Sequence, residues 1–340
     1  MDPPRSSQPP SGQAVSRRTV SRQAWTGLGL LLLGGVGLLG IRAATARSGA
    51  GMLDSTDRLL AGGDGAIRLA SAAQFGPDPA QRLQMFVPTD RALDPAVTGR
   101  LLPIVMFIHG GGWASGDPHD YRFIARMIAP YGHAVVLAGY RLHPDGRYPA
   151  MLEDGAAAMG WIADNATAQG GDCARVVLMG HSAGAYNAVM LALDPRWHAA
   201  SGLPPCALRG IVGLAGPYDF LPLDDHTTIS TFGHLEDLDE TQPITHVRGD
   251  APPLLLIHGT DDTRVRPRHS IALARAFASC GARSETHLIE GVGHEGLIMR
   301  FARPFSRDKR PLAHVLAFLA RVTAHDTAAS ASAPVQAVGA

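Results

Sequence analysis

The sequence has little cysteine and no excess of either charge. Its three cysteines, Cys173, Cys206 and Cys280, are spaced neither as metal ligands nor as a disulfide framework. Lysine plus arginine and aspartate plus glutamate number 30 each, so the charge balance indicates no nucleic-acid partner. No internal repeat is present. We therefore expect no metal site and no nucleic-acid-binding surface.

Two common phosphate-binding patterns are also missing. The glycine run Gly110–Gly112 is not spaced as G-x-G-x-x-G, which excludes the dinucleotide fingerprint. No Lys-Ser or Lys-Thr pair follows it, which excludes a P-loop. The chemistry described below needs only groups of the protein itself. With both phosphate-binding patterns missing, we therefore expect no cofactor.

The N-terminus has the layout of an export signal. Arg17 and Arg18 precede an uncharged apolar stretch at residues 24–41, and the small-residue site Ala44-Thr45-Ala46 follows. The paired arginines partly match a twin-arginine signal. The rival interpretation is an uncleaved anchor, because 18 apolar residues approach the ~20 that span a bilayer. We expect residues 1–46 to be a signal peptide or membrane anchor, with membrane association through residues 24–41. The protein would then be exported, to the periplasm or the extracellular space, or anchored in the cytoplasmic membrane.

The rest of the chain alternates apolar runs and helix-like segments. Residues 47–80 are rich in Gly, Ala and Asp and are expected to be a linker, and residues 323–340 a disordered tail. Between them, strands and helices alternate over residues 81–322, which predicts an α/β domain with a mostly parallel sheet covered by helices on both faces. The expected strands are 82–87, 103–108, 134–138, 176–179, 208–214, 254–257 and 286–289, and the expected helices are 121–128, 151–163, 185–193, 268–278 and 312–322.

A Gly-x-Ser-x-Gly sequence follows the apolar run 176–179. In Gly180-His181-Ser182-Ala183-Gly184 the glycines remove side chains that would collide across a sharp turn. Such a turn between a strand and a helix holds a serine hydroxyl clear of the backbone. The pattern alone is short enough to arise by chance as an ordinary turn. Ser182 is a candidate nucleophile only if an oxyanion site, a base and an acid accompany it.

A glycine-rich loop after the strand 103–108 supplies the first of these parts. In His109-Gly110-Gly111-Gly112-Trp113, consecutive glycines leave backbone N–H groups uncovered, as an oxyanion hole requires. A flexible surface loop is the alternative. The flanking His109 and Trp113 argue against it, and we expect His109 to be structural.

Candidate acid and base residues follow the last two strands. Asp261 and Asp262 follow the strand 254–257 and compete as the acid, unless one of them only caps the next helix. His294 lies in a glycine-flanked loop after the strand 286–289, whereas His287 would lie inside that strand. The order Ser182, Asp262, His294 is the order of α/β-hydrolases.

These motifs together resemble the α/β-hydrolase carboxylesterases over roughly residues 82–319. The resemblance is to esterases of the hormone-sensitive-lipase and feruloyl-esterase-like groups, and to isoprenylcysteine methylesterases and kynurenine formamidases. It is carried by the following stretches: 109–116 (His-Gly-Gly-Gly-Trp-Ala-Ser-Gly), 139–142 (Gly-Tyr-Arg-Leu), 148–149, 153–154, 170–172, 175–176, 180–184, 258–265 and 293–294.

The resemblance implies roles for individual residues. It assigns the acid to Asp262 and the oxyanion donors to the N–H groups of Gly111, Gly112 and Ala183, with Gly110 still open. It implies an α/β-hydrolase fold with a small cap at residues 217–250. Trp113 is expected either to line the substrate pocket or to pack under the oxyanion loop, and Tyr218 to contact substrate.

The sequence thus predicts a serine carboxylic-ester hydrolase, acting through an acyl-enzyme on a small-molecule ester with a small or medium acyl or aryl group. One alternative is an amide hydrolase of the arylformamidase or peptidase type with the same triad. Another is a non-catalytic ligand-binding relative, which would typically lack a triad member.

Overall fold

The computed structural model describes residues 49–60 and 62–324. The expected signal or anchor at residues 1–46 and the tail beyond residue 324 lie outside this part of the chain. Within it, no helix combines the length and the apolar character needed to cross a bilayer.

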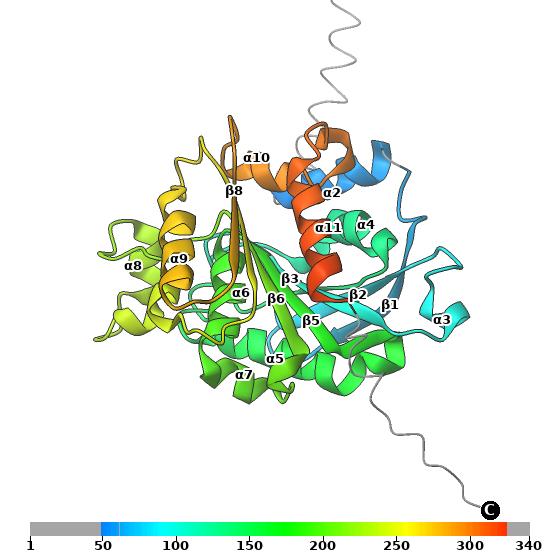
Figure 1. Ribbon diagram of the computed structural model, residues 1–340, viewed down its shortest axis with the longest axis horizontal. Coiled ribbons are helices and arrows are strands. Elements are labelled where there is room, and N and C mark those ends of the chain that lie inside the picture. The colour runs from blue at the N-terminus through cyan, green and yellow to red at the C-terminus, as the bar shows by residue number, and fades with distance from the viewer. Residues whose placement is uncertain (1–48, 61, 325–340) are drawn as a thin grey trace, which may run out of the picture. The chain divides into compact units, whose positions relative to one another are not determined.

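An eight-stranded sheet runs through the centre of the fold (Figure 1), in the order β1-β2-β4-β3-β5-β6-β7-β8. β2 pairs antiparallel with both β1 and β4, and all other neighbours are parallel. The expected α/β-hydrolase architecture with a mostly parallel sheet is confirmed. The strands are β1 Ile67–Gln74, β2 Arg82–Pro88, β3 Leu102–Ile108, β4 Ala134–Ala138, β5 Gly171–His181, β6 Leu208–Leu214, β7 Leu254–Gly259 and β8 Ser284–Ile289.

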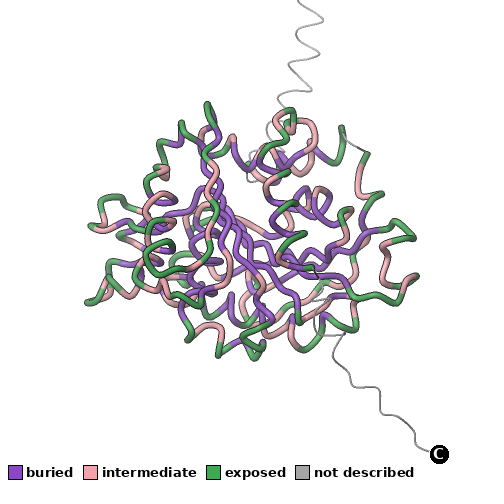
Figure 2. The backbone as a smooth tube through the Cα atoms, viewed as in Figure 1, coloured by how far each residue is buried: buried purple, intermediate pink, exposed green. Residues whose placement is uncertain are grey.

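Helices cover both faces of this sheet. One apolar core joins it to α5, α6 and α9, and a second core joins it to α2, α4, α10 and α11. Every residue of β3 is buried between them, and buried residues concentrate along the central strands in Figure 2. The helices are α2 Gly49–Leu60, α3 Pro95–Thr98, α4 Arg122–Ile128, α5 Ala150–Asn165, α6 Ala183–Leu193, α7 Pro195–Ser201, α8 His226–Phe232, α9 Arg268–Ser279, α10 His294–Met299 and α11 Arg310–Val322, with 3-10 turns η1 Pro118–Tyr121, η2 Ala129–Tyr131, η3 Thr167–Gln169, η4 Pro205–Ala207, η5 Asp239–Thr241, η6 Pro243–His246 and η7 Arg303–Phe305.

The segment 47–80 is not the linker that its composition predicts. It contains α2 and β1, and β1 adds an edge strand to the sheet beside β2. Asp57 of α2 is fully buried and forms an ion pair with the buried guanidinium of Arg126 in α4. The aspartates that predicted a linker therefore include Asp57, whose buried ion pair attaches α2 to the rest of the domain.

Candidate active site

Ser182 occupies a sharp turn between β5 and α6. Its φ of 56° and ψ of −122° lie in a region that L-residues rarely adopt. A Cβ on Gly180 would lie 2.1 Å from the carbonyl oxygen of Gly184, and one on Gly184 would lie 2.1 Å from that of Ile108. Only glycine fits at both positions, and the turn is closed by the Ser182 N–H donating to the Leu214 carbonyl at 2.8 Å. The two glycines thus permit the turn that presents the hydroxyl.

The three predicted catalytic side chains form one chain of hydrogen bonds. His294 Nε2 lies 2.8 Å from Ser182 Oγ, and His294 Nδ1 lies 2.7 Å from Asp262 Oδ2. Each residue follows the carboxyl end of a strand, and these ends meet at one edge of the parallel sheet. Asp262 and His294 are 3% and 6% exposed, so water competes little for their contact.

The structure also separates the competing candidates. Asp261 is exposed and accepts a hydrogen bond from the Thr260 hydroxyl, so it does not orient His294. His287 lies within β8, where its ring stacks on His314. His109 is buried between the rings of Tyr121 and Tyr140.

The second carboxylate oxygen of Asp262 is held by the backbone. The N–H groups of Arg264 and Val265 donate to Oδ1 at 3.0 and 2.9 Å. Burial by itself raises the pKa of this carboxyl, but hydrogen bonds from His258 and His294 outweigh it and leave the pKa well below its usual range. Asp262 is therefore a carboxylate at neutral pH, as stabilisation of an imidazolium requires.

His258 is a neighbour of the triad for which the sequence analysis predicted no separate role. Its Nε2 lies 2.7 Å from the Val265 carbonyl and 3.4 Å from Asp262 Oδ2, and its Nδ1 lies 2.8 Å from Ser270 Oγ. Because a carbonyl only accepts, Nε2 carries a proton, and Nδ1 shares a hydrogen bond with the Ser270 hydroxyl. His258 thus ties the loop after β7 to α9 and directs a donor at the triad acid. Its place in the 258–265 motif, directly before the glycine that ends β7, was the available signal.

His181, the residue before Ser182, lies beside the ring of His294. It is buried, and its Nε2 lies 3.3 Å from the His294 carbonyl oxygen, to which it can only donate. Burial, followed by the proximity of His294, lowers its pKa to about 3. A neutral His181 therefore holds the start of α10 in place without adding a charge to the site.

The glycine loop 109–113 lies beside Ser182. Gly111, Gly112 and Ala183 line the same cavity as Ser182, and Gly111 and Gly112 have φ values of 124° and 59°. A Cβ on Gly110 would lie 2.8 Å from the His181 carbonyl oxygen, so this glycine packs against the end of β5. The arrangement suits Gly111, Gly112 and Ala183 as oxyanion donors.

Trp113 both borders the cavity and packs beneath the glycine loop. It lines the cavity, yet it is only 3% exposed. Its indole N–H donates to Asn187 Oδ1 of α6 at 3.0 Å, and its ring makes edge contacts with Tyr186 and Phe232. The indole therefore joins the oxyanion loop to the nucleophile helix and to α8 of the predicted cap.

Tyr218 does not contact the cavity, contrary to expectation. Its side chain is fully buried, and its hydroxyl packs against Gly213 of β6 and Gly216 of the turn after it. The neighbouring Pro217 and Phe220 line the cavity instead. The chain does approach the site here, but Tyr218 points into the core.

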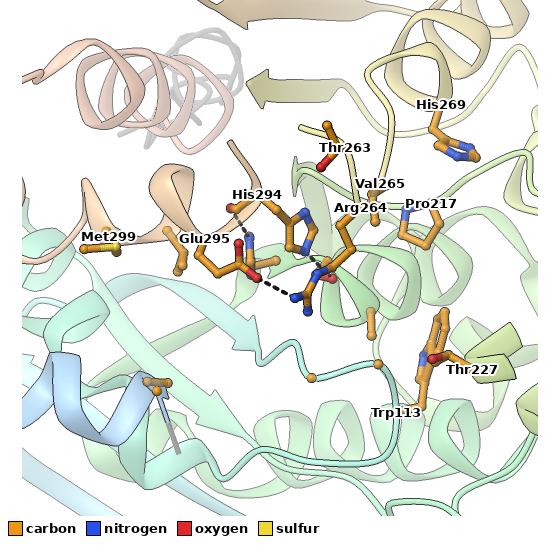
Figure 3. A pocket seen from close by; sticks show the side chains of 18 of the residues that line it. Trp113, Pro217, Thr227, Thr263, Arg264, Val265, His269, His294, Glu295 and Met299 are labelled. Atoms are coloured by element: carbon orange, nitrogen blue, oxygen red, sulfur yellow. Dashed lines mark hydrogen bonds and ion pairs between the residues drawn. The ribbon is translucent and has the colours of Figure 1, made fainter. Parts of the chain in front are cut away.

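The cavity in front of Ser182 has a volume of about 1040 Å³. Figure 3 shows His294 near its centre, with the Arg264–Glu295 ion pair, at 2.9 Å, beside it. Helices α2, α8 and α10 contribute to its walls. Within the described residues, no group of three His, Cys, Asp or Glu side chains is placed to hold a metal ion.

A mostly parallel sheet whose strand ends bring serine, histidine and aspartate to one cavity defines an α/β-hydrolase fold with a Ser-His-Asp triad. The model of the BD-FAE family matches residues 92–277, more than half of the chain, and the protein belongs to this family.

Relatives with curated names are similar over most of the folded domain. The probable isoprenylcysteine alpha-carbonyl methylesterase ICMEL1 of Oryza sativa subsp. japonica is 30% identical over 257 residues, covering 69% of this chain and 59% of that protein. Esterase LipC of Mycobacterium tuberculosis is 28% identical over 269 residues, covering 72% and 62%. The chain thus spans about three fifths of the length of these relatives.

Solved structures show the same fold. Esterase B from Lactobacillus Rhamnosis matches with a TM-score of 0.66 and 22% identity, covering 86% of this chain and 96% of that one. The expected resemblance to esterases of the α/β-hydrolase fold is confirmed.

Proposed function

We propose that the protein is a serine carboxylic-ester hydrolase that forms an acyl-enzyme on small or medium acyl or aryl esters. The observation that carries this proposal is the continuous hydrogen-bond chain from Asp262 through His294 to the strained Ser182. The esterase names of several relatives support the ester class of substrate.

In the first half-reaction, Ser182 Oγ attacks the acyl carbon while its proton passes to His294 Nε2. The negative charge on the former carbonyl oxygen is stabilised by the N–H groups of Gly111, Gly112 and Ala183. One such donor contributes about 3–4 kcal/mol in hydrolases. The bond to the alcohol oxygen then breaks, and His294 gives that oxygen its proton.

The second half-reaction repeats these steps with water. His294 accepts a proton from water as its oxygen attacks the acyl carbon, and Ser182 leaves with the proton from His294. Asp262 remains ionised throughout and stabilises the imidazolium that forms twice in each cycle. No metal or redox group takes part in these steps.

The test uses Ser182→Ala and a matched control, Ser279→Ala, whose serine lies at the end of α9 away from the cavity. Ser182→Ala should abolish both hydrolysis of p-nitrophenyl acetate and labelling by a fluorophosphonate probe. Ser279→Ala should retain both. Near wild-type hydrolysis by Ser182→Ala would refute the proposal. An unreactive Ser182 in the wild-type protein would instead favour the ligand-binding alternative.

The same panel tests the amide alternative. Formyl-anilides and peptides are offered beside the acetyl ester at equal concentration. A kcat/KM for an amide that exceeds the ester value would replace the ester assignment while retaining the triad.

Export or membrane anchoring is proposed from residues 16–46 alone. Sequencing the N-terminus of protein from fractionated cells tests it, with cleavage expected after Ala46. An intact Met1 on protein from the soluble cytoplasmic fraction would contradict both export and anchoring.

A further inference from the structure

The cavity is chemically divided. On one side of His294, helices α2, α4 and α10 and the turn η7 present mainly apolar side chains, with Thr56 and the ion-paired Glu295 as the exceptions, while most charged side chains gather on the other side under α8 and α9. Figure 3 shows Met299 on one side of His294 and Trp113, Thr227 and His269 on the other. The apolar side is formed by Met52, Leu53, Phe123, Ile298, Met299 and Phe305.

The side chains of the apolar side range from fully buried to about half exposed. Leu53, Phe123 and Ile298 are 8%, 0% and 8% exposed, whereas Met52 and Phe305 at the outer end are 49% and 42% exposed. Contiguous exposed apolar side chains that line a cavity are one feature of ligand-binding grooves. A path therefore leads from solvent to Ser182 along an apolar wall.

The opposite side is polar and strongly charged. Arg264, Arg266 and Arg268 follow the triad acid at alternate positions, and Asp224 and Asp225 face the same cavity from the start of α8. All five side chains are exposed. The apolar Trp113, Pro217 and Val265 lie among them, so this side is mixed and suits the polar part of an ester, which remains partly solvated.

The volume exceeds what an acetyl ester needs. Cavities of about 300–1,000 Å³ enclose most of a drug-sized molecule, and this one is about 1040 Å³. A short ester at Ser182 would leave the apolar wall in contact with water.

We infer that the substrate is an amphiphilic ester whose extended apolar chain lies against α2 and α10 and whose polar part lies under α8 and α9. This inference rests on the proposed function. The chain belongs either to the acyl group or to the alcohol, and both forms present the same chemistry to the wall. Each methylene buried there is expected to raise kcat/KM by about fourfold.

Two matched pairs of soluble esters test the inference by titration of the released acid. Monohexanoylglycerol against monoacetylglycerol places the chain on the acyl side, and hexyl lactate against ethyl lactate places it on the alcohol side. We expect kcat/KM to rise on the order of 100-fold with chain length in at least one pair. The pair that rises identifies the side of the ester bond that carries the chain.

Variants locate the effect on the wall. Met52→Trp fills the outer part of the apolar side from a half-exposed position, and Met299→Trp fills it from α10. Both should lower the long-to-short ratio of kcat/KM at least tenfold. Leu59→Trp is the control, because Leu59 lies on the same helix, is 83% exposed and does not line the cavity. Its ratio should match the wild type.

The outcomes separate the two proposals. Hydrolysis of all four esters without chain preference would overturn this inference and leave the proposed function standing. A preference that Met52→Trp and Met299→Trp both leave intact would also overturn it. Absence of hydrolysis of every ester, with no reaction of Ser182 towards a fluorophosphonate, would overturn the proposed function and the inference together.

Discussion

Replacing Arg126 should detach helix α2 from the domain. The guanidinium is fully buried and contacts three carboxylates, Asp57 at 2.5 Å, Asp54 at 2.5 Å and Asp64 at 2.6 Å. In Arg126→Met, Asp57 keeps Arg303 and Asp54 keeps the Phe123 N–H, but the central positive charge is gone. Breaking a buried ion pair from one side costs about 3–5 kcal/mol, because the remaining charge stays buried without its partner.

For a domain of this size, such a loss corresponds to a Tm about 6–10 °C lower. Arg58→Met is the matched control, since Arg58 lies on α2 itself, is 63% exposed and is 4.0 Å from Asp64. An exposed pair contributes less than about 1 kcal/mol. Urea denaturation and calorimetry measure both variants. A loss in Arg126→Met no larger than that in Arg58→Met would refute the idea that the buried network holds α2.

Three further predictions concern the active site. His258→Ala should lower kcat on the order of 10- to 100-fold with a smaller change in KM, because the triad acid loses a donor that positions it; an unchanged kcat would contradict this role. Trp113→Phe should lower stability by about 1–3 kcal/mol, because Asn187 Oδ1 loses its buried donor, and equal urea midpoints for both proteins would count against it. The pKa of Asp262 is depressed from 3.8, so the stability that its carboxylate contributes is complete above about pH 4 and is lost as the pH falls further. The destabilisation caused by Asp262→Asn should therefore shrink as the pH falls below 4, and a cost that grows as the pH falls below 4 in urea titrations would show that the sign is wrong.

The hydrogen-bonded arrangement of Ser182, His294 and Asp262 was predictable because each residue lies at a strong local signal. Ser182 lies between two glycines that the turn requires, and His294 and Asp262 lie just after apolar runs that form β8 and β7. In a parallel sheet, residues that follow successive strands meet at one edge, so sequence order alone brings them together. The periodicity of the buried strands likewise predicted β4 and β6 with their observed bounds.

The parts that sequence missed depend on contacts between distant segments. Helix α2 was predicted to be part of a linker from its Gly, Ala and Asp content, and that content does not show that Asp57 is buried opposite Arg126. Tyr218 follows a strand as the catalytic residues do, but its side-chain direction depends on packing with Gly213 and Gly216. His258 and His181 are ordinary histidines in the sequence. Their roles appear only when the loops after β7 and β8 are placed around them.

Helix α2 both forms the ion pairs with Arg126 and provides one wall of the cavity. Gly49, Met52, Leu53 and Thr56 recur at a helical spacing and line the cavity, while Asp54 and Asp57 lie on the adjacent face that binds Arg126. Weakening the ion pairs therefore displaces one wall of the cavity without touching Ser182, His294 or Asp262. If that wall holds an apolar chain, Arg126→Met should lose its preference for long esters at temperatures below its own unfolding, whereas rates on short esters should fall less. Stability and chain-length specificity would then be coupled through α2, and Arg58→Met, which leaves the buried network intact, should show neither effect.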